Sequence, residues 1–212
     1  MTSVKSICTS LTALVLLAFI WGCSQSSKPI SVPDNVSTVA GGYPFALQIK
    51  KRLADDAHLT AVLVDLEREG DRFHVVNLTY AFAITNGPGR IMAVTVNNLT
   101  HQACATLDAP ELPKDPLIPG SIFQPLDLAK VGLEIPAVLE LARTNGLAEF
   151  CALAPGQSGV VSLHLGNAAT GPVWSLTGDG WDEKGPIADL AIVLDAKTGA
   201  VLRHTVQKAV NR

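Results

Sequence analysis

The sequence lacks a dense basic stripe, a long uninterrupted apolar run and an extended set of cysteines. Its 16 Lys and Arg residues are outnumbered by 19 Asp and Glu residues, which gives a formal net charge of −3. Nucleic-acid-binding domains gather Lys and Arg on one face, and no such clustering occurs along this chain. We therefore expect no nucleic-acid partner.

The motifs of common enzymes and metal sites are also missing. None of the five histidines belongs to an H-E-x-x-H motif or to another known spacing of metal ligands. They are His58, His74, His101, His164 and His204. Residues 156–159 read Gly-Gln-Ser-Gly, which is too short for the G-x-S-x-G nucleophile turn and indicates a hairpin turn. Residues 179–183 carry three carboxylates but lack the alternating oxygen ligands of an EF-hand, so we interpret them as a solvated turn. We predict a protein that is not an enzyme, with no catalytic residues, metal or cofactor.

The N-terminus has the pattern of a secretion signal. Lys5 precedes an apolar stretch that ends at Gly22, directly before Cys23 and a polar run. A signal needs roughly 7–15 apolar residues, whereas a membrane-spanning helix needs about 20. Residues 20–23, Ile-Trp-Gly-Cys, resemble the lipobox of bacterial lipoproteins, although the bulky Trp21 departs from its pattern.

The lipobox resemblance implies that residues 1–22 are removed and that Cys23 receives acyl chains such as palmitate. Two or more chains give stable membrane anchoring. Ser24, rather than Asp, follows the cysteine, which favours the outer membrane over the inner one. We expect a lipid-anchored protein of the periplasm; an uncleaved membrane anchor is the alternative. Loss of Lys5 would take the net charge from −3 to −4.

Cysteines supply one candidate disulfide. Cys8 leaves with the signal and Cys23 takes the lipid, so Cys104 and Cys151 remain in an oxidising compartment. Two cysteines 47 residues apart do not form a metal-binding motif. We predict a Cys104–Cys151 disulfide, with two buried free thiols as the alternative.

The order of helices and strands predicts an α+β protein with two units, each a helix followed by antiparallel strands. Residues 23–40 are expected to be a tether, 41–107 unit one, 108–125 a proline-rich linker and 126–212 unit two. Proline density excludes regular structure in the linker. Pro44 is expected to begin an amphipathic helix, and strands are expected at 59–66, 73–84 and 91–96. The shared plan suggests a tandem repeat.

The second unit is expected to open with a short helix from Ile135-Pro136 to Thr144, with a helical turn or two at 127–133. Strands are expected at 148–154, 159–165, 172–177, 188–195 and 200–206. Trp174 is expected to pack in the core. With Trp181 it is also a candidate for a partner-binding surface.

The last hairpin, Asp195-Ala-Lys-Thr-Gly-Ala-Val201, resembles the end of a PepSY domain. Asp195 and Thr198 can bond local backbone there, and Gly199 can adopt a positive φ. The resemblance covers roughly residues 126–206 and implies an extracytoplasmic binding or inhibitory module without catalysis. A generic β-hairpin is the alternative.

We thus expect a membrane-anchored periplasmic lipoprotein that binds a protein or peptide and that could inhibit a peptidase. The second hypothesis is a carrier of an apolar ligand or lipid. A cavity of several hundred Å3 lined by aliphatic side chains would favour the carrier. A filled core with an exposed apolar patch or sheet edge would favour the binding module. The sequence does not identify the binding residues.

Overall fold

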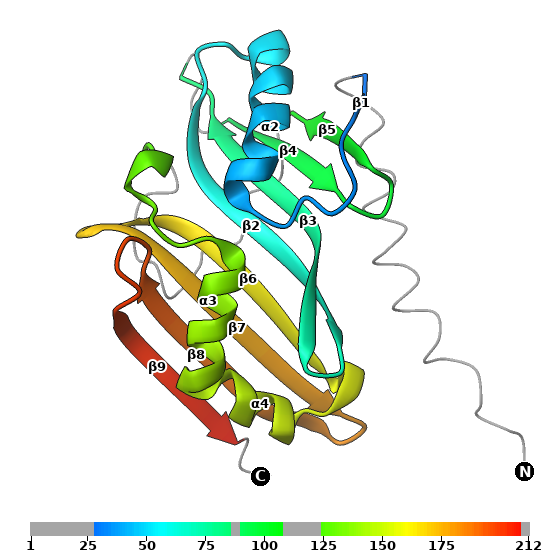
Figure 1. Ribbon diagram of the computed structural model, residues 1–212, viewed down its shortest axis with the longest axis vertical. Coiled ribbons are helices and arrows are strands. Elements are labelled where there is room, and N and C mark those ends of the chain that lie inside the picture. Colours follow the sequence, from blue (N-terminus) through cyan, green and yellow to red (C-terminus); the bar gives the residue numbers. More distant parts are fainter. Residues whose placement is uncertain (1–27, 86–89, 108–123, 209–212) are drawn as a thin grey trace, which may run out of the picture.

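A single antiparallel sheet organises the chain. The computed structural model describes residues 28–85, 90–107 and 124–208. Within these residues, nine strands lie in the order β1-β5-β4-β3-β2-β6-β7-β8-β9 (Figure 1). They are β1 (Ile30–Ser31), β2 (His58–Glu69), β3 (Arg72–Ala83), β4 (Ile91–Asn97), β5 (Gln102–Thr106), β6 (Gly159–Ala168), β7 (Gly171–Asp182), β8 (Gly185–Asp195) and β9 (Val201–Lys208).

This architecture corrects the predicted fold class. The expected α+β arrangement of two helix-plus-antiparallel-sheet units is wrong, because β2 and β6 hydrogen-bond to each other and make one continuous sheet. Val62 pairs with Leu165 and Val64 with Leu163 at this junction. All four side chains are almost fully buried, so the junction is part of the core.

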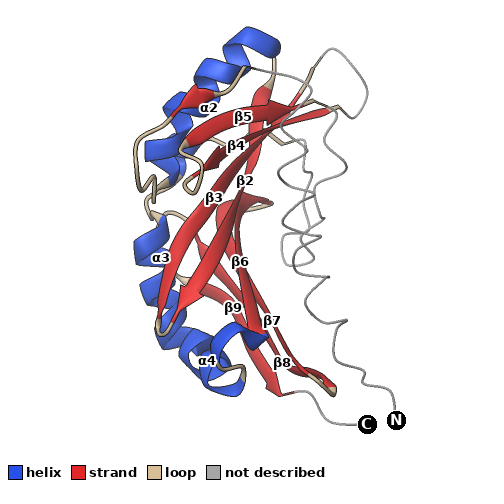
Figure 2. Cartoon of the chain, turned by 90° about the vertical axis from the view of Figure 1, so that its right-hand side faces the viewer, coloured by secondary structure: helices blue, strands red, loops and turns tan. Residues whose placement is uncertain are grey.

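Helices cover one face of this sheet. They are α2 (Val39–Leu53), α3 (Ile135–Ala142) and α4 (Ala148–Leu153), with a π-helical turn at Arg143–Leu147 and short 3-10 turns at Leu128–Lys130 and Gly156–Ser158. Figure 2 shows that the sheet is curved and that the helices lie along its outer side. Of the described helices, none is long and apolar enough to cross a membrane.

Helix α2 begins earlier than the sequence predicts. Residues 30–40 were expected to be tether, yet Ile30 and Ser31 form β1 and the helix starts at Val39. The Thr38 hydroxyl caps its first turn by accepting a hydrogen bond from the Gly41 amide at 3.0 Å. Gly42 lies inside the helix, where a Cβ atom would fall 2.4 Å from the Tyr80 hydroxyl oxygen. Gly42 therefore permits a close approach between α2 and β3.

The expected strand at 148–154 is also wrong, because these residues form α4. Phe150 is fully buried against the β6–β7 hairpin. A Cβ atom at Gly178 would lie 2.9 Å from Phe150 Cζ, and one at Gly180 would lie 2.8 Å from Ala154 Cβ. The two glycines let the helix lie close to β7. They also show which face of β7 points toward the helices.

The other elements of the second half are close to expectation. The helix predicted from Ile135 is α3, and the turn predicted at 127–133 is the 3-10 turn at Leu128–Lys130. The strands predicted from 159, 172, 188 and 200 are β6 to β9. The predicted signal peptide, Cys23 and most of the predicted proline-rich linker lie outside the described residues.

Candidate functional site

The histidines do not converge on a metal site. His74 lies 3.3 Å from Glu69 beside the β2–β3 turn, in the middle of the strand order. His101, directly before β5, lies 3.1 Å from Asp34 near the edge strand β1. The other three are on β2, β6 and β9. Within the part of the chain that the structure describes, no group of three or more His, Cys, Asp or Glu side chains could hold a metal ion.

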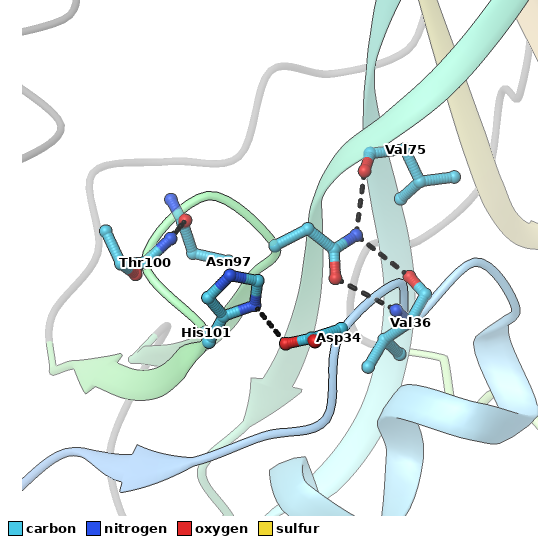
Figure 3. A network of polar contacts seen from close by, with 7 residues as sticks. Asp34, Val36, Val75, Asn97, Thr100 and His101 are labelled. Carbon is cyan, nitrogen blue, oxygen red and sulfur yellow. Dashed lines mark hydrogen bonds and ion pairs between the residues drawn. The ribbon is translucent and has the colours of Figure 1, made fainter.

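A polar network holds the segment before α2 against the sheet. The Asn98 side chain accepts a hydrogen bond from Val36 N at 3.0 Å and donates to Val36 O at 3.0 Å and Val75 O at 2.7 Å. Figure 3 shows the exposed Asp34–His101 pair beside this network. Asn98 satisfies three backbone groups, so its role is to position the chain that leads into α2.

Cys151 corrects the predicted disulfide. It is a free cysteine on α4, so the Cys104–Cys151 bridge is wrong. The helix carrying Cys151 covers the second half of the sheet, whereas Cys104 is on β5, toward the opposite edge. Four strands separate β5 from β7. Because neighbouring strands are about 4.8 Å apart, the distance across all of them far exceeds the Cα–Cα span of a disulfide. Burial raises the pKa of the Cys151 thiol, and the nearby Arg68 opposes that shift.

The hairpin between β8 and β9 has the predicted local structure. Asp195 Oδ1 accepts hydrogen bonds from the Lys197 amide at 3.0 Å and the Thr198 amide at 2.7 Å. Gly199 has a φ of +78°. The turn packs against the segment before α3, since the Gly132 and Leu133 amides both donate to Ala196 O. Its role is structural.

The two tryptophans of the second half have opposite environments. Trp174 is fully buried, as predicted, and its indole N–H donates to Leu133 O at 3.0 Å. Trp181 is 56% exposed at the end of β7. A large exposed aromatic side chain is unusual and is typical of binding surfaces.

Strand alternation places Trp181 on the sheet face opposite the helices. Gly178 and Gly180 face α4, so Asp179 between them points to the other side. A register shift follows, because Gly180 pairs with Ala188 but Trp181 pairs with Pro186. The extra residue, Ile187, is on β8, so the alternation along β7 continues and Trp181 shares the face of Asp179. Val160 is directly opposite Asp179 on β6 and is 63% exposed. Asp189 is directly opposite Asp179 on β8. We call Val160, Asp179, Trp181 and Asp189 the hairpin-end patch.

The register brings these four side chains together. Trp181 is two residues beyond the partner of Val160, and such diagonal neighbours are roughly 7–8 Å apart, within reach of an aromatic ring. Asp179 and Asp189 are both exposed and carry like charges on directly paired positions. The patch therefore combines two exposed apolar side chains with two carboxylates on the face opposite the described helices.

The sequence identified only part of this patch. Residues 179–183 were interpreted as a solvated turn, but Asp179 to Asp182 belong to β7, so that interpretation is corrected. Val160 and Asp189 were missed. The alternation of Gly178 and Gly180 with Asp179 and Trp181 is the signal that could have placed them in a strand. The strand pairing that joins them is not visible in sequence.

A separate pocket of about 320 Å3 lies beside the β6–β7 turn. It is lined by Gln124, Pro125, Asp127, Lys130 and residues 167–172. Asp127 and Lys130 form an ion pair at 3.7 Å, and the Asn167 amide donates to Pro125 O. The lining consists of polar, small and proline residues and differs from the aliphatic lining expected of an apolar carrier.

Comparisons with known proteins assign no family. No protein-family model matches the chain, and a search of curated proteins finds no match. The predicted PepSY-like identity is therefore unsupported. One similar solved structure is a "putative lipoprotein" (CD1622) from Clostridium difficile 630, at 19% identity, covering 78% of this chain and 92% of that one. Its TM-score is 0.43.

Proposed function

We propose that this chain is a lipid-anchored protein of the bacterial cell envelope that binds a protein or peptide partner, without catalysis, through the hairpin-end patch. The observation that carries the proposal is the exposed pair Val160 and Trp181 on the face of the sheet opposite the described helices. Adjacent exposed apolar side chains at the end of a rigid sheet are typical of partner-binding surfaces.

The anchor rests on the sequence pattern at Gly22-Cys23. Intact mass of the mature protein is expected to begin at Cys23 with acyl chains attached, and Cys23→Ala is expected to leave an unprocessed precursor. A mature, unlipidated N-terminus elsewhere would contradict the anchor. It would leave the binding proposal intact.

Site-specific photo-cross-linking tests the binding proposal. A photoreactive residue at Ser162, which is exposed and two residues from Val160 on the same face, would sample the surface around the patch. The matched control places the same residue at Lys51, which is exposed on α2 on the other side of the sheet. In envelopes of the source bacterium, we expect a saturable adduct from position 162 that is absent from position 51.

The adduct from position 162 is also expected to disappear in a Trp181→Ser background, because large aromatic side chains at the centre of an interface supply much of its affinity. No adduct from position 162, or the same adducts from both positions, would contradict the proposal. Hydrolysis of an envelope substrate by the purified protein, lost on changing one Ser, His or carboxylate, would contradict the absence of catalysis.

A further inference from the structure

We infer that the partner of the hairpin-end patch is a basic protein segment, whose Lys or Arg side chains contact Asp179 and Asp189 while an apolar side chain contacts Trp181 and Val160. This inference rests on the proposed function and names the chemistry of the partner. It excludes an acidic peptide and a second copy of this chain as occupants.

The first support is electrostatic. Asp179 and Asp189 are directly opposite each other on paired strands, and like charges at such positions destabilise a sheet. Two further exposed acidic residues follow, Asp182 at the end of β7 and Glu183 in the β7–β8 turn. Lys184 in the same turn is the single basic residue among them. A ligand that carries positive charge would relieve the repulsion, which the free protein retains.

The second support is the arrangement of apolar and charged groups. Val160 pairs with Asp179, and Asp179 pairs with Asp189, so one row of the sheet presents an apolar side chain and two carboxylates in succession. Trp181 lies in the neighbouring row, two residues along β7 from Asp179, and is diagonal to Val160. An extended or helical segment that combines Lys or Arg with an apolar residue matches this order. Charge complementarity of this kind accelerates association and selects against acidic partners.

The same residues argue against self-association through the patch. Two copies meeting at this surface would bring four aspartates together, two from each copy. Juxtaposed like charges at an interface are costly, so a second copy is a poor occupant.

The test uses the full chain in neutral phosphatidylcholine nanodiscs and a fluorescent peptide in which lysine alternates with leucine and serine. The counterpart peptide carries glutamate in place of each lysine. Fluorescence anisotropy is measured at low and high salt, and binding to empty nanodiscs is subtracted. We expect saturable binding of the lysine peptide that weakens with salt, since ions screen exposed charges. The glutamate peptide should not bind.

Variants locate the binding. We expect the double change Asp179→Asn and Asp189→Asn to weaken lysine-peptide binding about tenfold, which is roughly 1.4 kcal/mol. The same change removes the like-charge pair, so the melting temperature should stay equal or rise. Opposite effects on binding and stability exclude misfolding as the cause. The matched control is Asp55→Asn with Asp56→Asn, which changes net charge equally at two exposed residues after α2.

Each result decides the inference. Tenfold weakening by the patch variant, with the control variant unchanged, supports it. Equal binding of both peptides, equal losses in both double variants, or a dimer that dissociates on Trp181→Ser would overturn it. The proposed function fails separately. If the Ser162 adduct persists in the Asp179→Asn and Asp189→Asn background, the patch binds a partner and only the basic chemistry is wrong.

Discussion

At the scale of single residues, Asp195 shows how one side chain fixes a turn. Its carboxylate accepts hydrogen bonds from the backbone and hydroxyl of Thr198 and from the Lys197 amide. These bonds lower the pKa of Asp195 below its ordinary value of 3.8, and the bond from the Thr198 backbone amide has the largest effect. A lowered folded-state pKa means that the stabilisation is present above pH 3.8 and is lost as the pH falls through the folded value.

The first prediction follows from this pKa. Asp195→Ala should lower the free energy of unfolding by about 1 kcal/mol at pH 7, because turn hydrogen bonds are lost. The difference in the free energy of unfolding between the variant and wild type should shrink as the pH falls below the ordinary pKa of aspartate. Urea unfolding at both pH values measures it, with Asp56→Asn as the exposed control. A difference that is independent of pH would show that the carboxylate charge is not involved.

The second prediction concerns Cys151. Because it is a free thiol with a raised pKa, alkylation at pH 7 should be slower in the native protein than in the unfolded chain. Mass spectrometry of non-reduced peptides should nevertheless recover Cys151 in alkylated form. Cys151→Ser should cost far less than the roughly 4 kcal/mol that loss of a long-loop disulfide would cost. Recovery of alkylated Cys151 only after reduction would contradict the free thiol.

At the scale of elements, one carboxylate ties the start of helix α2 to the second half of the chain. Glu134 Oε2 accepts from Val39 N at 2.7 Å and its Oε1 accepts from Ala40 N at 3.0 Å. A helix N-terminus has unpaired amides and a positive dipole end, which a carboxylate satisfies. The Tyr80 hydroxyl donates a hydrogen bond to Val39 O at 2.6 Å. Burial is the main reason that the pKa of Tyr80 is raised far above its ordinary range, and the negative charge of Glu134 raises it further.

The third prediction tests this cap. Glu134→Gln replaces a charge-assisted pair of hydrogen bonds with a neutral amide that can accept only through one oxygen. It should lower the free energy of unfolding by about 1 kcal/mol. Hydrogen exchange of amides in the first turn of α2 should accelerate. Glu140→Gln on the exposed side of α3 is the control and should leave that exchange unchanged. Acceleration in both variants would contradict the specific cap.

Elements were predicted where local pattern and burial agree. Strands β2, β3 and β4 were expected within a few residues, because their apolar residues face the core. Helix α2 was expected to start late, because Gly42 and Pro44 look like a helix boundary in sequence. The actual start depends on Glu134, which lies 95 residues away from Val39. Helix α4 was expected to be a strand, because a short apolar segment fits either structure.

At the scale of the whole molecule, the two halves share one sheet and one core. The sequence predicted a helix and strands in each half but could not predict the β2–β6 pairing. Strand partners are set by contacts far apart in sequence, such as Val62 with Leu165. The candidate site was hidden for the same reason: Val160, Asp179 and Asp189 come together only through strand register.

The last prediction tests whether the shared sheet makes the halves one cooperative unit. Leu165 is fully buried and is paired with both Val62 and Trp174, so it lies at the junction of the two halves. Leu165→Ala should lower the free energy of unfolding by about 2–5 kcal/mol through lost burial and a cavity. Two independent units would confine that loss to the half that contains Leu165.

The two halves can be followed separately. Residues 23–212 contain tryptophan only at positions 174 and 181, so in a protein of that span tryptophan fluorescence reports on the second half, whereas hydrogen exchange of β4 reports on the first. If the two halves form one cooperative unit, Leu165→Ala lowers the urea midpoint of both signals equally, because β2 loses its hydrogen-bonded neighbour when β6 unfolds. The control is Leu202→Ala on the edge strand β9, which is 54% exposed and should leave both midpoints nearly unchanged. Protection of β4 that outlasts the fluorescence transition would mean that the first half folds without its neighbour.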